Sequence, residues 1–402
     1  MKWNENAPKG YLTGVNLGGW ISQFGKKGKD HWDSFVTENT IAKVKELGFD
    51  HVRVPVDDQL IESAPFVPNE EGLAYIDNCL AWCKKHGLNM ILDLHAAPGY
   101  SFSTLEENSL FDDPVKMDRF VWIWEMFAKR YIEEGDNLLL ELVNEMVEPD
   151  SSRWNPLAHR TVKAIRAIDK TRWIVFGGNN YNAVFELKNI DLIPDDEHIL
   201  YNFHFYEPLP FTHQRASWNK LLATYTASLD IFYPGEFTDV EAFLATKPEG
   251  NVAEVERCVG HKNDKEYLYS RLQPALDFMQ ATGKPVYCGE YGVIDVAPAD
   301  SRVNWAKDMT DWFLEHNIGR AVWSLHKMNF ALIGTEHEGF HILNKEFLHQ
   351  VARSKLNAKK GRKIFPSLFL LSGIFFSAGH KQRVAVLFPV VLNHAGLLHH
   401  FG

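Results

Sequence analysis

Two glutamates at the ends of apolar segments are the strongest candidates for chemistry in this sequence. Glu145 closes the segment LLLELVNE (residues 138–145), and Glu290 lies in PVYCGEYG (residues 285–292). Two carboxyl groups that face one cleft suit hydrolysis of a glycosidic bond, because one can protonate the leaving oxygen while the other attacks the anomeric carbon. The pair therefore predicts a sugar-cleaving site, if the fold brings the two segment ends together.

Further residues that could serve such a pair stand at the ends of similar segments. An arginine beside one carboxyl would hold it ionised, because a nearby cation lowers a carboxyl pKa. A tryptophan offers an apolar face on which a sugar ring can rest. Besides the glutamates, the residues of suitable type at segment ends are Arg53, His95, Asn144, His204, Tyr206 and Trp323.

Eight short apolar segments carry these residues, and helical patterns fill most of the gaps between them. Near-continuous apolar runs are typical of strands covered on both faces. Their ends lie 29 to 49 residues apart, except for one step of 84 residues between Tyr206 and Glu290. The segments lie near residue 15 and at 51–56, 90–95, 138–145, 172–178, 198–206, 285–292 and 320–326.

This order predicts an α/β fold, a (β/α)8 TIM barrel with an inserted subdomain after strand six at about residues 207–260. Reactive groups of such barrels collect at the C-terminal ends of the strands, so the candidates would meet in one cleft. The alternative is a doubly wound open sheet, but GVNLGG (residues 14–19) lacks the Gly-x-Gly-x-x-Gly order usual there. We expect residues 1–358 to form the catalytic barrel.

Capping residues predict one end of each of two helices. Apolar residues at helical spacing from Leu73 to Cys83 precede Gly87, which suits the residue after a helix C-terminus. Asp300 or Ser301 is expected to cap a second helix that carries Trp305.

Composition and charge exclude several classes of protein. The 402 residues are 45% hydrophobic and 23% charged, which is ordinary for a globular protein and unlike a disordered chain, coiled coil or collagen. The net charge of −10 disfavours nucleic acid and anionic membranes as partners, because both require a basic face. We expect a monomer that has neither nucleic acid nor a membrane as a partner.

No pattern in the sequence indicates a metal or an organic cofactor. The four cysteines form no CxxC pair, and the eighteen histidines show no HExxH or clustered ligand spacing. The first ten residues are polar and lack the apolar core of a signal peptide, so we expect a cytoplasmic protein, or a secreted one whose leader has been removed.

The C-terminal tail, residues 359–402, differs in character from the rest. Residues 364–379 are apolar and uncharged, and residues 385–398 are nearly so. Neither run reaches the length of a transmembrane helix, and each contains a proline. Three interpretations remain open: an extension of non-native origin, an apolar segment packed on the barrel, or a membrane contact.

The ordered set of motifs resembles glycoside hydrolase family 5, the cellulase A family, over about residues 12–355. Within that family the sequence is most similar to the bacterial endoglucanase C type, which also has a subdomain inserted after strand six. The motifs that carry the resemblance are NLGGWISQ, HVRVP, DLHAAPG, LVNE, NNYN, YNFHFY, YCGEYGV and VW. One departure is Ala96, where relatives have a second histidine.

The resemblance implies a β-glucan polysaccharide or oligosaccharide as the partner, and a role for each candidate. Glu145 would be the general acid/base and Glu290 the nucleophile. Arg53 and Tyr206 would bond Glu290, and His204 would orient Glu145 or couple to its charge. Asn144 would bind the sugar 2-hydroxyl, His95 would line the same subsite, and Trp323 would stack beneath the sugar. No cofactor is implied, and the two carboxyl groups should lie about 5–5.5 Å apart, as in retaining enzymes.

Several other residues have two interpretations. Trp20, Trp154, Trp218 and Tyr181 lie near strand ends and are either sugar platforms or packing residues. Glu141 is expected to point into the barrel as a buried structural partner, because it lies four residues before Glu145 in the same segment.

The leading hypothesis is a retaining endo-β-glucanase that cleaves β-1,4 linkages in cellulose-type or mixed-linkage β-1,3-1,4-glucan. The alternative within the same class is another β-glycan specificity, namely a β-mannanase, an exo-1,3-glucanase or a β-glucosidase. Two other classes are a sugar-binding barrel without turnover, which would lack one glutamate, and an aldolase or isomerase, which would need a lysine or metal ligands at strand ends.

Overall fold

Eight parallel strands close into a barrel in the computed structural model, which describes residues 4–25 and 27–355. Going around the barrel, the order is β1-β12-β11-β8-β7-β6-β5-β2, with β2 closing on β1. The TIM-barrel prediction is confirmed. The barrel strands are β1 (Thr13–Asn16), β2 (His51–Asp57), β5 (Asn89–Ala96), β6 (Leu138–Glu141), β7 (Ile174–Gly177), β8 (Ile199–Phe205), β11 (Val286–Tyr291) and β12 (Gly319–Val322).

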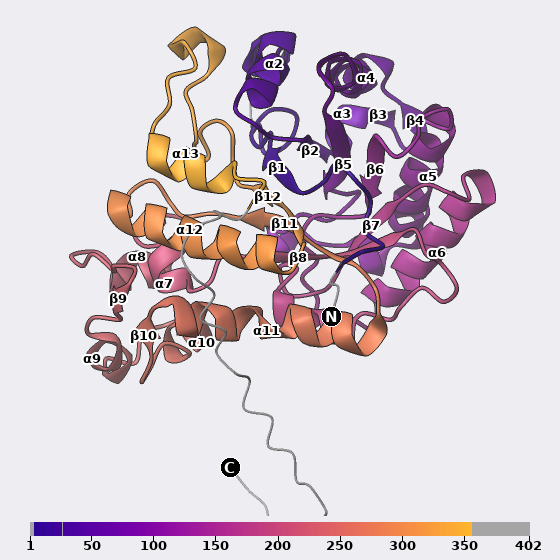
Figure 1. Cartoon of the computed structure of the whole chain (residues 1–402). Coiled ribbons are helices and arrows are strands. Elements are labelled where there is room, and N and C mark those ends of the chain that lie inside the picture. The colour runs from indigo at the N-terminus through magenta and orange to yellow at the C-terminus, as the bar shows by residue number, and fades with distance from the viewer. Residues whose placement is uncertain (1–3, 26, 356–402) are drawn as a thin grey trace, which may run out of the picture. The chain divides into compact units, whose positions relative to one another are not determined.

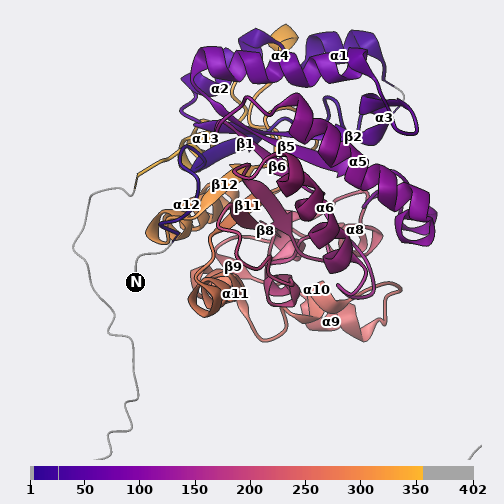
Figure 2. The same ribbon diagram turned by 90° about the vertical axis from the view of Figure 1, so that its right-hand side faces the viewer.

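Helices surround the strands, which occupy the centre of both views (Figures 1 and 2). This arrangement explains why the strands are apolar along nearly their whole length, since both faces are buried. The helices outside the segment between β8 and α11 are α1 (Lys29–Phe35), α2 (Glu38–Glu46), α3 (Asp58–Ile61), α4 (Glu70–His86), α5 (Pro114–Arg130), α6 (Trp154–Ile168), α11 (Lys265–Thr282), α12 (Ala299–Glu315) and α13 (Lys345–Val351). Short 3-10 helices occupy Leu105–Glu107, Leu110–Asp112, Val184–Asn189 and Glu336–Glu338.

One of the two predicted helix ends is confirmed and the other is wrong. Helix α4 ends at His86 and is followed by Gly87, which has the left-handed φ of 66° that glycine adopts without strain. Helix α12 begins at Ala299 after Pro298, so neither Asp300 nor Ser301 is its cap. Asp300 instead lies in the first turn of the helix, where its negative charge interacts favourably with the helix dipole.

The long step in the sequence corresponds to a run of short elements between β8 and α11. They are α7 (Leu209–Thr212), α8 (Lys220–Tyr225), β9 (Gly235–Glu236), α9 (Val240–Ala245), α10 (Ala253–Glu256) and β10 (Lys262–Asn263), with β9 and β10 antiparallel. They gather at one side of the barrel (Figure 1). That this segment is a subdomain of its own stays a prediction. A second small sheet pairs β3 (Glu62–Ala64) with β4 (Val67–Pro68).

Several large aromatic side chains belong to the core. Trp20 and Trp154 are completely buried, and the Nε1 of Trp154 donates to the carbonyl oxygen of Gly177 at 2.9 Å. Both are therefore packing residues and not sugar platforms. Among the described residues, no helix has the length and apolar character needed to cross a membrane. The predicted tail, residues 359–402, lies outside the described residues.

Candidate active site

The two predicted catalytic glutamates lie together at the C-terminal end of the barrel. Glu290 is the penultimate residue of strand β11, and Glu145 lies four residues beyond the end of β6. Both side chains are buried, and a carboxylate oxygen of one lies within 4.8 Å of a carboxylate oxygen of the other. This close approach is consistent with the retaining arrangement, in which the carboxyl groups are about 5–5.5 Å apart.

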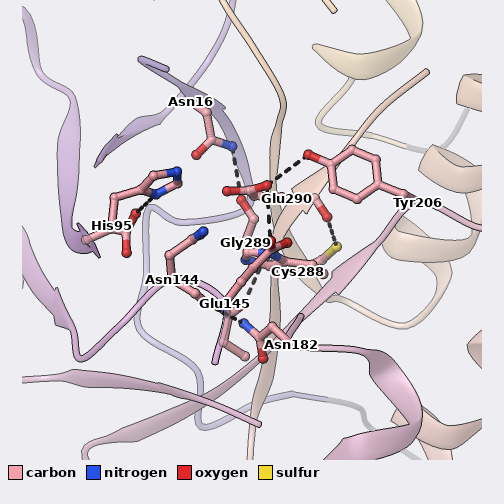
Figure 3. A network of polar contacts seen from close by, with 12 residues as sticks. Asn16, His95, Asn144, Glu145, Asn182, Tyr206, Cys288, Gly289 and Glu290 are labelled. Carbon is pink, nitrogen blue, oxygen red and sulfur yellow. Dashed lines mark hydrogen bonds and ion pairs between the residues drawn. The ribbon is translucent and has the colours of Figure 1, made fainter. Parts of the chain in front are cut away.

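Two donors hold the Glu290 carboxylate. Arg53 Nη1 donates to Glu290 Oε1 at 2.7 Å, and the Tyr206 hydroxyl donates to Glu290 Oε2 at 2.9 Å. Figure 3 shows the Tyr206 hydroxyl directed at this carboxylate, with Glu145 and Asn144 beside it. Burial raises the pKa of Glu290, whereas the charge of Arg53 and the bond from Tyr206 lower it.

Glu145 has a different environment, which favours its protonated form. Burial, followed by the charge of Glu290, raises the pKa of Glu145 well above its ordinary value. Glu145 Oε1 and His204 Nδ1 form a hydrogen bond of 2.8 Å, and burial lowers the pKa of His204 well below its ordinary value, so the histidine is neutral. Because Arg53 and Tyr206 bond Glu290, a proton shared by the two glutamates belongs on Glu145.

Arg53 connects the site to the interior of the barrel. It is completely buried, and it donates from Nε and Nη2 to both carboxylate oxygens of Glu141, at 2.7 and 2.9 Å. Its Nη2 also donates to Asn144 Oδ1 at 2.8 Å and lies 3.1 Å from Asp93 Oδ2. Glu141 is thus the buried structural partner that the sequence predicts, and it fixes the direction in which Arg53 faces Glu290.

The loop that carries Glu145 is fixed by a tyrosine. The Tyr100 hydroxyl donates to the backbone oxygen of Glu145 at 2.5 Å and accepts from the backbone N–H of Val147 at 2.7 Å. Asn182 lies on the neighbouring turn, where its backbone oxygen accepts from the N–H of His204 at 2.8 Å. These bonds hold the acid/base and its histidine in register although β6 has already ended.

Three buried nitrogen atoms of the site have no partner among the described residues. They are Asn144 Nδ2, His95 Nε2 and His204 Nε2. Buried polar groups are normally hydrogen-bonded, so unpaired ones at the mouth of a barrel indicate positions that a ligand completes. His95 Nδ1 is bonded to Asp93 Oδ2 at 2.7 Å, and burial lowers the pKa of His95 to about 4, so a neutral ring presents Nε2 to the site.

Trp323 provides an aromatic wall next to His95. The two rings are stacked, with centroids 5.7 Å apart and an angle of 3° between their planes. Gly18 lies against the indole, where an added Cβ would come within 2.7 Å of the ring, so only glycine fits. Polar atoms for hydroxyl groups and an aromatic face for C–H groups are what a sugar ring requires.

Glu145, His204 and Glu290 are also the one group of described residues whose donor atoms are close enough together to hold a metal ion. An ion there would occupy the carboxylate oxygens that paired-acid chemistry needs.

Comparison with known proteins agrees with this geometry. The sequence matches the cellulase family, glycosyl hydrolase family 5, over residues 11–329. The chain belongs to this family. It is 45% identical to Endoglucanase C of Acetivibrio thermocellus over 86% of this chain and 99% of that protein. It is 34% identical to Cellodextrinase A of Ruminococcus flavefaciens, over 78% of this chain and 84% of that protein.

Solved structures support the same fold. The endoglucanase Cel5A from the hyperthermophilic Thermotoga maritima superimposes with a TM-score of 0.68 at 21% identity, covering 87% of this chain and all of that one. At that identity the likeness concerns the barrel alone.

In this glycoside hydrolase, all eight predicted site residues lie in one connected cluster. Arg53 and Tyr206 bond Glu290, Arg53 also bonds Asn144, and His204 bonds Glu145. His204 Nδ1 lies 3.7 Å from Glu290 Oε2 and so brings the two groups together, and His95 with Trp323 forms the adjoining wall. Four further residues that bond members of this cluster were not predicted from the sequence: Asp93, Asn16, Tyr100 and Asn182. Asp93 could have been found by alternation, because it lies two residues before His95 in β5 and shares its face.

Proposed function

We propose that Glu145 and Glu290 cleave β-glucan chains by a double displacement that retains the anomeric configuration. Membership of family 5 makes the protein a glycoside hydrolase, and the 45% identity with Endoglucanase C supports endo action on β-glucan. The observation that carries the proposal is that two adjacent carboxyl groups differ in their hydrogen-bond donors, since Arg53 and Tyr206 both bond Glu290.

In the first step Glu145 gives its proton to the glycosidic oxygen while the Glu290 carboxylate attacks the anomeric carbon. The bond from that carbon to the glycosidic oxygen breaks, and its electron pair goes to the leaving sugar. A new ester bond joins the anomeric carbon to Glu290.

In the second step Glu145, now a carboxylate, removes a proton from water. The water oxygen bonds the anomeric carbon, the ester bond breaks, and its electron pair returns to Glu290. Two inversions give net retention, one water is consumed, and both glutamates regain their starting protonation.

The remaining site residues would bind the sugar at the cleavage point. Asn144 Nδ2, which is buried without a partner in the described part of the chain, would donate to the 2-hydroxyl, a contact that strengthens in the transition state. His95 Nε2 would bond another hydroxyl, and Trp323 would stack on the ring. Beyond Ala96 a polar pocket of about 610 Å³, lined by Gln23, Asp57, Gln59 and Asn108 among others, offers room for further sugar units.

We also propose that the monomer is the working unit, as expected from the sequence. A size-exclusion measurement combined with light scattering at assay concentration tests this. A species near 46.1 kDa is expected for the chain as given.

A reducing-sugar assay on barley mixed-linkage glucan, carboxymethylcellulose, laminarin and mannan tests the assignment. The wild type should degrade the β-1,4-linked or mixed-linkage glucans, and Glu145→Gln and Glu290→Gln should both be inactive on them. The control is Glu241→Gln, which changes an exposed glutamate of α9 and should behave as wild type. Near wild-type rates in both site variants would refute the proposal.

A further inference from the structure

A cluster of four aromatic rings leads from the nucleophile to the protein surface. Tyr206, which bonds Glu290, contacts His213 at 5.1 Å and Phe330 at 5.8 Å between ring centroids. His213 and Phe330 contact each other at 5.3 Å. Trp218 then rests on both, at 6.0 and 6.4 Å. The cluster is therefore continuous from the catalytic carboxylate to Trp218.

Trp218 is the exposed end of this cluster. It is 54% exposed, whereas Phe330 beneath it is buried. Burial lowers the pKa of His213 to about 4, so the cluster carries no charge at neutral pH. A single exposed tryptophan needs no explanation, but one supported by rings that reach the nucleophile offers an oriented flat face.

The backbone on both sides holds this face in place. In the turn that carries Trp218, Ala216 N–H donates to the His213 carbonyl and Asn219 N–H donates to the Ala216 carbonyl, both at 3.0 Å. The side chain of Asn219 accepts from Leu222 N–H at the start of α8. These bonds fix the backbone that carries Trp218.

Phe330 is positioned by a run of unusual backbone. The three residues before it, Lys327–Asn329, all have φ between 49° and 62°, a left-handed conformation that is strained for side chains other than glycine. Such strain concentrates at functional sites. Here it places the ring that supports Trp218.

The position of Trp218 assigns it to one side of the scissile bond. Glu145 must give its proton to the leaving sugar, and its carboxyl is bonded to His204 on β8. Trp218 belongs to the segment that follows β8. In the closed barrel β2 lies opposite β8. A glucan whose leaving unit lies over β8 would therefore extend its other end towards β2.

We propose that Trp218 is the platform for the glucosyl unit on the leaving-group side, and so also for an incoming acceptor sugar. This rests on the double displacement proposed above. The C–H face of a glucosyl ring would stack on the indole, and the segment between β8 and α11 would thereby supply a subsite that the barrel alone lacks.

Reactivation of a trapped glycosyl-enzyme isolates this subsite. The enzyme is labelled with 2-deoxy-2-fluoro-β-cellobiosyl fluoride, freed of reagent, and allowed to recover either in buffer or with added cellobiose. Cellobiose reacts when its hydroxyl attacks the anomeric carbon, gives its proton to Glu145 and releases Glu290. The variants are Trp218→Ala and Trp218→Phe, with Phe232→Ala as control, because Phe232 is 51% exposed in the same segment and outside the cluster.

In Trp218→Ala the acceleration of recovery by cellobiose should fall by about tenfold or more, while recovery in buffer and turnover of β-cellobiosyl fluoride stay as in wild type. Trp218→Phe should keep most of the acceleration, and Phe232→Ala all of it. If cellobiose accelerates recovery of Trp218→Ala as much as that of wild type, the inference about Trp218 is wrong, while the double displacement still stands. A slower labelling step in this variant would also overturn the inference, because it would place the indole on the other side of the scissile bond. Failure of the wild type to form any adduct would instead refute the double displacement on which the inference rests.

Discussion

Arg53 on β2 reaches the carboxylate of Glu290 on β11 and donates to its Oε1 from Nη1 at 2.7 Å. The other nitrogens of the guanidinium are bonded to Glu141 and Asn144, so the bidentate pair with Glu141 fixes the direction of Nη1. One oxygen of the nucleophile is thereby tied to a buried cation, and the second is bonded by Tyr206. This asymmetry separates the roles of two glutamates that lie within 4.8 Å of each other.

Loss of the Tyr206 hydroxyl should move the acid limb of the pH profile. The hydroxyl stabilises the ionised form of Glu290, so Tyr206→Phe should raise the pKa of that carboxyl. Because Glu290 must be ionised to attack, the acid limb of kcat/KM should shift to higher pH. Tyr233→Phe is the matched control, since the Tyr233 hydroxyl bonds Asp308 away from the site. An acid limb that is unchanged, or that moves to lower pH, would contradict the assigned bond.

Removal of the acid/base should be compensated by an external nucleophile. Glu145→Ala should lower kcat on a natural glucan by about 10²–10⁴-fold, because no group then protonates the leaving oxygen. With an activated aryl cellobioside and sodium azide, the variant should recover and release a β-glycosyl azide, which NMR can identify. Rescue that yields the α-azide would mean that Glu145, and not Glu290, is the nucleophile.

The contact predicted between Asn144 and the 2-hydroxyl can be measured with a double cycle. Asn144→Ala should lower kcat/KM on an aryl β-cellobioside by about ten- to a hundredfold. On the matching 2-deoxy substrate the same substitution should cost much less, because the hydroxyl is already absent. Equal losses on both substrates would show that Asn144 acts only through its bond to Arg53.

The stability of the protein should respond to the charge on Asp57. Burial raises the pKa of Asp57 to about 6, so between pH 4 and 6 the folded protein keeps a proton that the unfolded chain has released. The contribution of this group to stability is therefore lost as pH rises through that range, whereas an amide cannot ionise. The melting temperature of Asp57→Asn relative to wild type should increase from pH 4 to pH 7. A difference that is constant or decreases with pH would refute the assigned shift.

The barrel and most of its site could be predicted because buried strands require apolar residues, which form a recognisable pattern in the sequence. Strands covered on both faces are apolar runs in the sequence. Polar residues at the ends of such runs, such as Arg53 and Glu290, are costly to bury and therefore indicate a site. The order of these interruptions gave the eight residues that the structure brings together.

What the sequence could not predict depends on loops and on exposure. Tyr100 and Asn182 come from irregular turns, and the run 180–182 is left-handed, a conformation with no periodic signal. Four aromatic candidates were indistinguishable by type, yet Trp20 and Trp154 are buried while Trp218 and Tyr181 are exposed. Only the tertiary packing separates a core tryptophan from one available to a ligand.

The most direct test of the account is to identify the residue that becomes covalently bound to the sugar. The enzyme is inactivated with 2,4-dinitrophenyl 2-deoxy-2-fluoro-β-cellobioside, digested, and examined by peptide mass spectrometry. The account predicts one fluorocellobiosyl group per chain, attached to Glu290, with no label in Glu290→Gln. An adduct on Glu145, or turnover that releases the α-anomer first and leaves no adduct, would contradict it.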